Sequence, residues 1–215
     1  MSLKLFYAPG ACSFVPHAAL ELAGADFEPA LVKLHKGEHR TPDYLALNPR
    51  GQVPVLVDGD QVITQIVAIG LHLDARFPQA GLLPAGGAAR TRALQTFAWM
   101  NNTVHPTFTH VFMPQKFTAD AAAQQAVKAH AVAAYRELLG EIEALAAAAG
   151  PWLGGEHPGL LDAYALTLLR WGGFAGIDPH TLPATWGLSQ RFAALPAVAR
   201  AVERERLELN VYKPQ

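Results

Sequence analysis

The sequence contains almost no cysteine and no surplus of charge of either sign. Cys12 is the only cysteine among 215 residues, which excludes an internal disulfide framework and a thiolate-based structural zinc site within one chain. A free thiol suits a reducing compartment, so we expect a cytoplasmic protein. The net charge is −1, with 17 basic and 18 acidic residues. Because no basic surplus is available to neutralise phosphates, we expect no nucleic-acid partner.

The chain also lacks an apolar segment that would predict a signal peptide or a membrane span. Pro9, Gly10 and Pro16 interrupt the beginning of the chain, where a signal peptide would need a continuous apolar stretch. Residues 93–115 contain no charged side chain, but asparagine, glutamine and histidine interrupt them. Such a helix is unsuited to a membrane. It favours one face on the core and a second face on a cleft or a partner subunit.

A stretch rich in proline and glycine, at residues 77–87, divides the chain by composition. Before it, strand-like and helix-like patterns alternate with turn signals, and after it the patterns are helical throughout. Stretches of this kind typically link domains. We therefore predict an α/β domain at residues 1–77 and an all-α domain at residues 87–215.

The first part is predicted to run as a βαβ unit followed by a hairpin and a helix. Ser13, Thr41 and Thr64 are the expected helix N-caps, because each hydroxyl precedes a helical pattern. A βαβ unit gives parallel neighbours and a hairpin gives antiparallel ones, so the sheet should be mixed. The four predicted strands lie within residues 3–7, 27–34, 53–57 and 61–63.

The second part is predicted to be a series of helices, of which Pro106 bends the first. Phe97, Val104, Phe108 and Phe112 recur at helical spacing, and such stripes are more often core than cofactor contacts. The predicted helices lie near residues 88–115, 119–149, 158–175, 184–194 and 196–208.

Cys12 is the first residue with potential chemistry, since it lies in the turn between a predicted strand and a predicted helix. A helix N-terminus favours a thiolate, so we expect a Cys12 pKa below the free value of about 8.5, at about 6–7.5. The alternative is an inert, buried thiol. Tyr7 and Ser13 flank Cys12, and either hydroxyl could donate a hydrogen bond to a thiolate. Each could equally be a packing tyrosine or a plain helix cap.

Several polar positions could bind an anionic or extended ligand. The N–H groups of the helix turn that begins at Gln65 and Ile66 could hold a carboxylate. Lys36 and His39, in a polar loop, could pair with an anion or simply be solvated. His105 could be a catalytic group or a hydrogen-bonded histidine at the edge of a cleft. No metal site is expected, because His105 and His110 do not share a helix face.

The order of these signals resembles the cytosolic glutathione transferase family, and most of all its bacterial beta-like kind with a cysteine in the first turn. The first half of the chain carries the more specific part of the resemblance. The matching segments are residues 4–13 (KLFYAPGACS), 37–56 (GEHRTPDYLALNPRGQVPVL) and 162–171 (DAYALTLLRW). The resemblance implies a thioredoxin-like N-terminal domain with a mixed four-stranded sheet, an all-α helical bundle as C-terminal domain, and a homodimer.

The resemblance also implies which residues form the site. Cys12 would face the glutathione sulfur, with Tyr7 and Ser13 close by as the other catalytic candidates. A cis peptide bond before Pro54 would turn Val53 N–H and C=O toward the ligand. The implied glutathione-binding residues are Lys36, His39, Gln52, Val53, Pro54, Gln65 and Ile66. The implied residues of the electrophile pocket are His105, Phe108, Phe112 and Trp171.

The activity implied is conjugation of the glutathione thiol, as co-substrate, to small hydrophobic electrophiles, without a metal. Two other functions remain open: thiol–disulfide exchange through Cys12, and a non-catalytic binding protein with the same fold. Three positions depart from the family pattern. Ile66 stands in place of the usual serine or glycine, Thr103 in place of an acidic residue, and Gly159 in place of the serine or threonine that forms a capping box with Asp162.

Overall fold

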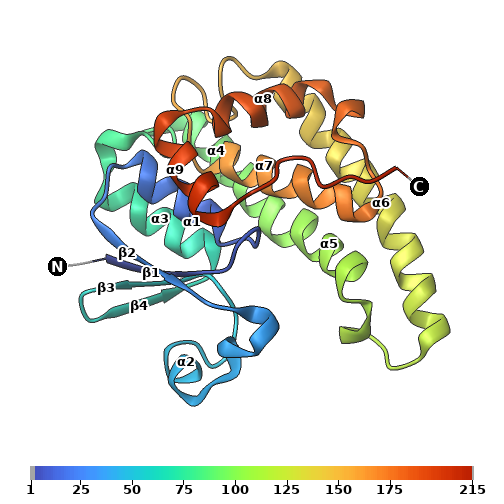
Figure 1. The fold of residues 1–215 in the computed structure, drawn as a ribbon. Helices are drawn as coiled ribbons and strands as arrows, with labels where there is room; N and C mark the ends of the chain where they lie inside the picture. The colour runs from blue at the N-terminus through green and yellow to red at the C-terminus, as the bar shows by residue number, and fades with distance from the viewer. Residues whose placement is uncertain (1–2, 215) are drawn as a thin grey trace.

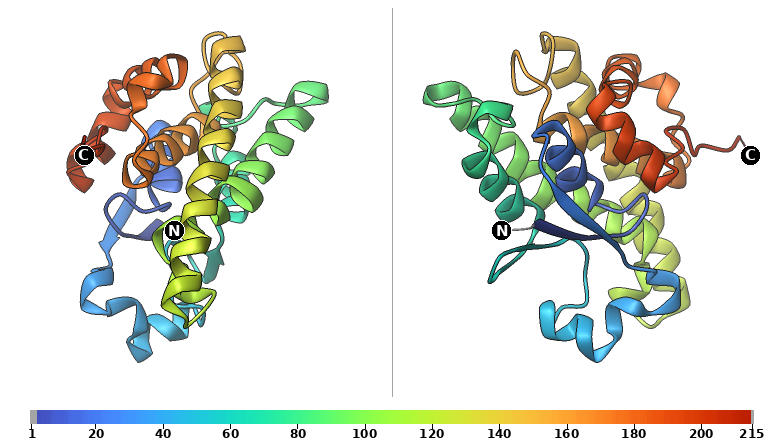
Figure 2. Two further views of the ribbon diagram at one scale, coloured as in Figure 1. Left: turned by 90° about the vertical axis from the view of Figure 1, so that its right-hand side faces the viewer. Right: turned by 60° about the vertical axis from the view of Figure 1, so that its left-hand side comes forward.

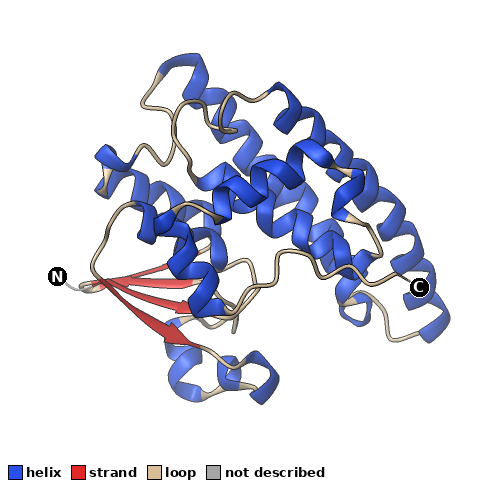
Figure 3. Cartoon of the chain, turned by 45° about the horizontal axis from the view of Figure 1, so that its top comes forward, coloured by secondary structure: helices blue, strands red, loops and turns tan. Residues whose placement is uncertain are grey.

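The computed structural model describes residues 3–214. Its strands are β1 (Leu3–Tyr7), β2 (Phe27–Leu31), β3 (Val55–Asp58) and β4 (Gln61–Thr64). They form one sheet at one end of the molecule, and helices fill the remainder (Figures 1 and 3). The sheet order is β2-β1-β3-β4, in which only the pair of β1 and β2 is parallel. The predicted mixed four-stranded sheet is therefore confirmed.

The two faces of the sheet carry different helices, because side chains alternate along each strand. The helices of this part are α1 (Phe14–Leu22), α2 (Pro42–Leu47) and α3 (Ile66–Arg76). Leu5 and Tyr7 of β1 belong to the main core with α1 and α3. Val55 of β3 packs instead in a small cluster with Tyr44 of α2. Figure 1 accordingly shows α1 and α3 on one side of the sheet and α2 on the other.

The second part is helical, as predicted. The described residues after β4 contain no strand, apart from an isolated bridge between Trp152 and Gly155. The helices are α4 (Gly87–Trp99), the π-helical turn η4 (Met100–Val104), α5 (His105–Phe112), α6 (Ala121–Ala148), α7 (Leu160–Gly172), α8 (Pro183–Ala193) and α9 (Pro196–Glu205). The division into two domains at residues 77 and 87 stays a prediction, since one core cluster contains residues from both parts.

Local details correct several expectations. The single helix predicted for residues 88–115 is interrupted by the π-helical turn and ends at Phe112. Pro106 accounts for the interruption, because it has no N–H to donate to the carbonyl four residues earlier. Ser13 and Thr64 do not cap helices through their side chains, and the residue that precedes α3 is Gln65. Thr41 does cap α2, by accepting a hydrogen bond from Tyr44 N–H at 3.4 Å.

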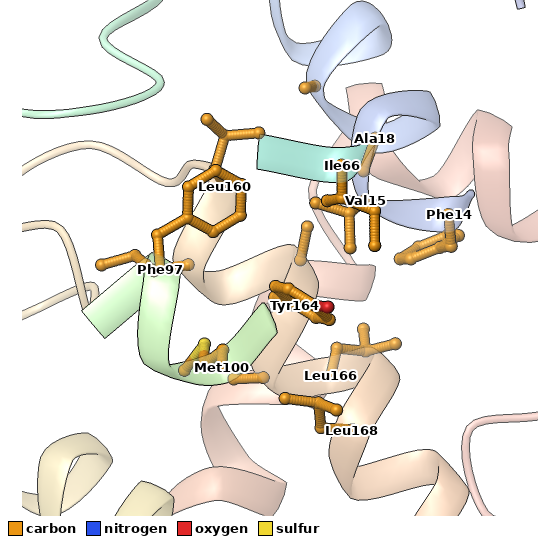
Figure 4. Close-up of a cluster of buried hydrophobic side chains, with 14 of the residues drawn as sticks. Phe14, Val15, Ala18, Ile66, Phe97, Met100, Leu160, Tyr164, Leu166 and Leu168 are labelled. Atoms are coloured by element: carbon orange, nitrogen blue, oxygen red, sulfur yellow. The ribbon is translucent and has the colours of Figure 1, made fainter. Parts of the chain in front are cut away.

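The core joins the two parts around α7, whose residues 160–169 are all buried. Figure 4 shows side chains of α1, α3, α4 and η4 converging on it, among them Phe14, Ile66, Phe97 and Met100 around Tyr164. Each such side chain contributes about 1.5–3 kcal/mol when fully buried. Because α1 is packed between the sheet and α7, the turn that precedes α1 lies at the junction of the two parts.

The start of α7 depends on Asp162. Its carboxylate accepts hydrogen bonds from the N–H groups of Gly159 and Leu153, both at 2.9 Å. Burial raises the pKa of Asp162 to about 6, although these N–H groups act in the opposite direction. A side chain would not fit at Gly159, because the backbone of Leu82 lies where its Cβ would stand. Asp162 therefore holds the helix start alone, as expected.

Candidate active site

Cys12 lies in the turn between β1 and α1, beside the loop that leads into β3. Its thiol is partly buried and faces the backbone carbonyl of Val53, with Sγ to O at 3.5 Å. The Val53–Pro54 peptide bond is cis, as the family resemblance implied. The structure thus brings the Cys12 turn and the Val53–Pro54 segment together, although 41 positions separate Cys12 from Val53 in the sequence.

The pKa expected for Cys12 is wrong in direction. Burial raises the pKa of the thiol to about 12, and the negative charge of Glu205 acts in the same direction. The N–H groups of Cys12 and Ser13 do favour the thiolate, as the position at a helix start suggested, but they are outweighed. Cys12 is therefore a neutral thiol in this structure. A neutral thiol can donate a hydrogen bond, whereas it is a poor nucleophile.

Among the described residues, neither hydroxyl beside Cys12 makes a hydrogen bond to its sulfur. Ser13 is fully buried, and its Oγ accepts from Ala8 N–H at 3.0 Å and donates to Ala8 C=O at 3.2 Å, so it closes the turn. Tyr7 packs in the core with its ring 4.9 Å from that of His17, and burial raises the pKa of its phenol. Which of Cys12, Ser13 and Tyr7 acts on a bound sulfur stays a prediction.

Gln65 and Ile66 begin α3 with an unusual backbone. Gln65 has φ of 75°, in the left-handed region that residues other than glycine seldom adopt. Backbone conformations of this kind cluster at ligand sites. The Ile66 side chain is only 4% exposed and belongs to the core. Its N–H lies in the first helical turn, where no acceptor within the helix is available, so it is free for a carboxylate.

The polar loop after β2 places Lys36 and His39 on two short 3₁₀ turns, at Leu34–Lys36 and Glu38–Arg40. Lys36 is exposed. His39 Nδ1 is buried and has no hydrogen-bond partner among the described residues. Burial, followed by the charges of Arg40 and Lys116, lowers the pKa of His39. An anion bound here would meet a cationic environment to which the helical part contributes Lys116, a residue that no sequence pattern had singled out.

Gln52 precedes the cis peptide bond and is held through its backbone. Its carbonyl accepts hydrogen bonds from Tyr44 Oη at 2.9 Å and from Asn48 Nδ2 at 2.8 Å. Its side chain is exposed. Tyr44 and Asn48 are buried, so they fix the loop that leads to Val53.

An aromatic wall lies on the helical side of the Cys12 turn, formed by Trp171, Phe108 and Phe112. The rings of Trp171 and Phe108 stack with centroids 4.7 Å apart, and those of Phe108 and Phe112 stack at 5.7 Å. Trp171 Nε1 donates to Gly10 C=O at 2.9 Å, which attaches this wall to the turn that carries Cys12. Phe112 is 58% exposed. The wall therefore runs from the Cys12 turn to the surface.

His105 lies against the same wall, with its ring centroid 4.8 Å from that of Trp171. Its Nδ1 is 2.7 Å from Tyr164 Oη, and that hydroxyl donates to Asn101 Oδ1 at 3.3 Å. Burial lowers the pKa of His105 to about 4. The imidazole is therefore neutral at physiological pH, so it could orient or polarise a ligand but could not supply a positive charge.

Comparison with known proteins decides the family. The family model described as the glutathione S-transferase N-terminal domain matches residues 1–75. Glutathione S-transferase GST-4.5 of Xanthomonas campestris is 34% identical over 207 residues, which cover 95% of this chain and 100% of that protein. The chain belongs to the glutathione S-transferase family. Glutathione S-transferase GstA of Escherichia coli O157:H7 is 32% identical and covers 96% of this chain and 100% of its own length.

Solved structures agree with this family and its fold. A glutathione transferase homologue from Sulfitobacter with bound glutathione has a TM-score of 0.89 and 26% identity, over 96% of this chain and 99% of that one. A beta-class glutathione S-transferase from Sphingomonas chungbukensis has a TM-score of 0.81 and 30% identity, over 95% and 100%. The maleylacetoacetate isomerase of Pseudomonas aeruginosa is also similar, at 31% identity over 93% of this chain and 95% of that protein.

One groove of this transferase lies outside the predicted site. A groove of about 900 Å³ separates α4 from α6 and is lined by Trp99, Leu145 and Trp152, among others; the two helices diverge there (Figure 2, left). None of the predicted site residues lines it.

Among residues 3–214, no helix is long and apolar enough to cross a membrane. The cytoplasmic location stays a prediction.

Proposed function

We propose that this chain conjugates the thiol of glutathione to small hydrophobic electrophiles. The attachment of the aromatic wall to the Cys12 turn, through Trp171 Nε1 and Gly10 C=O, is the observation that carries this proposal. Stacked rings that lead from the turn to the surface offer an apolar platform for an electrophile. A glutathione sulfur near Cys12 would then lie beside its reaction partner.

The glutathione site in this proposal uses donors and acceptors from the first part of the chain. Val53 N–H and C=O would pair with the peptide-like cysteinyl residue of glutathione, beside Pro54 and Gln52. Gln65 and the Ile66 N–H would hold the γ-glutamyl end, where a helix start favours a carboxylate. Lys36 and His39 would hold the glycine carboxylate, and the unpartnered Nδ1 of His39 supports this assignment.

Cys12 acts in this proposal as a hydrogen-bond donor to the glutathione thiolate and not as a nucleophile. A neutral thiol that faces the Val53 carbonyl supports this role. Lowering the pKa of the glutathione thiol by two units requires about 2.7 kcal/mol, which a charge-assisted hydrogen bond and a helix start supply together. In the chemical step the thiol proton passes to solvent, the sulfur bonds to the electrophilic carbon, and the leaving group departs with its electrons.

Cys12→Ala and Cys12→Ser separate conjugation from thiol–disulfide exchange. Wild type and both variants would be assayed with a chloronitroaromatic electrophile and with a glutathione mixed disulfide. We expect conjugation by wild type, retained by Cys12→Ser, whose hydroxyl still donates, and reduced about tenfold or more in Cys12→Ala. Turnover of the mixed disulfide by wild type alone, without conjugation, would contradict the proposal and assign Cys12 as the nucleophile.

Isomerisation is a second candidate function, favoured by the similarity to maleylacetoacetate isomerase over nearly the full chain. A glutathione thiolate that adds to a conjugated double bond permits rotation about that bond and is then expelled unchanged. Turnover of a cis-configured dicarboxylic diketone without consumption of glutathione would identify this activity. The same chloronitroaromatic assay, run in parallel, compares the two functions.

We also propose that the chain forms a homodimer through the segment without charged side chains. Asn101 and Asn102 lie on the π-helical turn, and Asn102 is exposed, so this uncharged surface is accessible to a second copy of the chain. Light scattering at micromolar concentration should give twice the chain mass of 23.1 kDa. A mass equal to that of one chain would contradict this proposal.

A further inference from the structure

Gly10, two residues before Cys12, is held on both sides by the helical part of the chain. Its N–H donates to Glu205 Oε2 at 2.9 Å, and its C=O accepts from Trp171 Nε1 at 2.9 Å. The residue has φ of +67°, and an added Cβ would lie 2.8 Å from Arg170 Nη1. The peptide groups around Gly10 are therefore fixed by residues of α7 and α9, about 160–195 positions away in the sequence.

Glu205 is a buried carboxylate at the end of α9, with 3% of its surface exposed. Figure 2 (right) shows α9 beside α1. Glu205 Oε1 lies 2.7 Å from Nδ1 of the fully buried His17 in α1. The other ring nitrogen, Nε2, lies 2.8 Å from Arg204 Nη1. A guanidinium only donates, so Nε2 is the acceptor and Nδ1 carries the proton that His17 donates to Glu205.

Within residues 3–214, both hydrogen bonds to Glu205 thus come from the first part of the chain, one from α1 and one from the Cys12 turn. Burying a carboxylate is costly unless every oxygen is satisfied. Here the cost is offset by Gly10 N–H, by His17 Nδ1–H and by the charge of Arg170, which interacts with that of Glu205. An apolar residue at position 205 would avoid the cost but would leave Gly10 N–H without a partner.

We propose that Glu205 is a positioning residue that fixes the Cys12 turn, and with it the direction of Cys12 Sγ toward the Val53 carbonyl. Only the expected change in conjugation kinetics rests on the proposed function; the fixing of the turn does not. The charge of Glu205 has a second effect, because it raises the pKa values of the Cys12 thiol and the Tyr7 phenol. Arg204 opposes it at Tyr7. Glu205 therefore helps to keep Cys12 protonated and able to donate.

Three variants separate the hydrogen bond from the charge. Glu205→Gln removes the charge and keeps an oxygen for Gly10 N–H, but its NH2 group then faces His17 Nδ1–H and cannot accept from it. Glu205→Ala removes the charge and both hydrogen bonds. Glu203→Gln makes the same chemical change at an exposed position of the same helix and serves as the matched control. Circular dichroism establishes that each variant is folded at the assay temperature.

Alkylation of Cys12 by iodoacetamide, followed against pH, tests the charge without glutathione, because this is the only thiol in the chain. We expect Glu205→Gln to be alkylated about threefold faster than wild type at pH 8, equal to a pKa lower by about half a unit. Glu203→Gln should match wild type. A merely structural role would lower the melting temperature of the Glu205 variants without moving this pH profile.

Conjugation kinetics test the positioning. We expect kcat/KM for glutathione to fall about tenfold in Glu205→Ala and to recover largely in Glu205→Gln. The inference is overturned if folded Glu205→Ala has the alkylation profile of wild type, or if it conjugates as wild type does. A shifted alkylation profile in a protein that never conjugates would keep the influence of Glu205 on the Cys12 thiol and refute the proposed function instead.

Discussion

Replacing Gly159 by serine should destabilise the protein, although serine is a preferred residue at a helix start. Gly159 directly precedes α7, and its N–H donates to the Asp162 carboxylate at 2.9 Å. A serine hydroxyl would complete a capping box with Asp162, a gain of about 1 kcal/mol. However, an added Cβ would lie 2.9 Å from the carbonyl carbon of Leu82 and closer still to its oxygen.

The Leu82 backbone is held on several sides, so it cannot move away without loss. Its carbonyl accepts from Leu160 N–H at 3.2 Å, and its side chain is buried. The next N–H, that of Leu83, donates to Asp74 Oδ1 at 3.1 Å. Loss of the Leu160 hydrogen bond costs about 1 kcal/mol, and displacement of a packed segment costs about 1–3 kcal/mol. After the gain from the cap, Gly159→Ser should lose about 1–3 kcal/mol of stability.

Thermal unfolding followed by circular dichroism measures the effect. For a chain of this size, the expected loss corresponds to a melting temperature about 2–12 °C lower. Gly159→Ala adds the Cβ without the cap and should be at least as unstable. Gly140→Ala in α6 is the control, because a Cβ there meets nothing within 4 Å and alanine favours the helix by about 0.5–1 kcal/mol. A Gly159→Ser protein that melts at or above the wild-type temperature would refute the reasoning.

Three further outcomes are expected. Burial lowers the pKa of His105 to about 4, so between about pH 4 and 6.5 the folded protein binds fewer protons at this residue than the unfolded chain does. The stability that His105 contributes is therefore lost as the pH falls through that window. An NMR titration midpoint near pH 6.5 would contradict this. Tyr135→Phe removes a buried hydroxyl that donates to Leu168 C=O at 2.7 Å and should lower the unfolding free energy in urea by about 1–2 kcal/mol; no change would argue against that hydrogen bond. Thr41→Ala removes the α2 cap and should cost about 1 kcal/mol, visible as faster amide exchange at Tyr44.

Short-range patterns in the sequence determined most of the fold. Residues 3–7 formed a strand and the hairpin formed as predicted, because turn chemistry and alternation act over a few positions. The third strand runs over Val55–Asp58 and not over 53–57, because Pro54 has no N–H to donate to the ladder. The Thr41 cap followed for the same reason. The family, confirmed by relatives over nearly the full chain, was recognisable from the order of motifs in the first half.

Tertiary structure decided what depends on burial and on partners distant in sequence. The position of Cys12 at a helix start predicted a lowered pKa, but burial and the charge of Glu205 raise it to about 12. Ser13 has the sequence of a cap and instead ties the turn at Ala8. No pattern pointed to Glu205, because its partner Gly10 lies 195 positions away. Electrostatic effects follow distance and desolvation, and folding alone sets both.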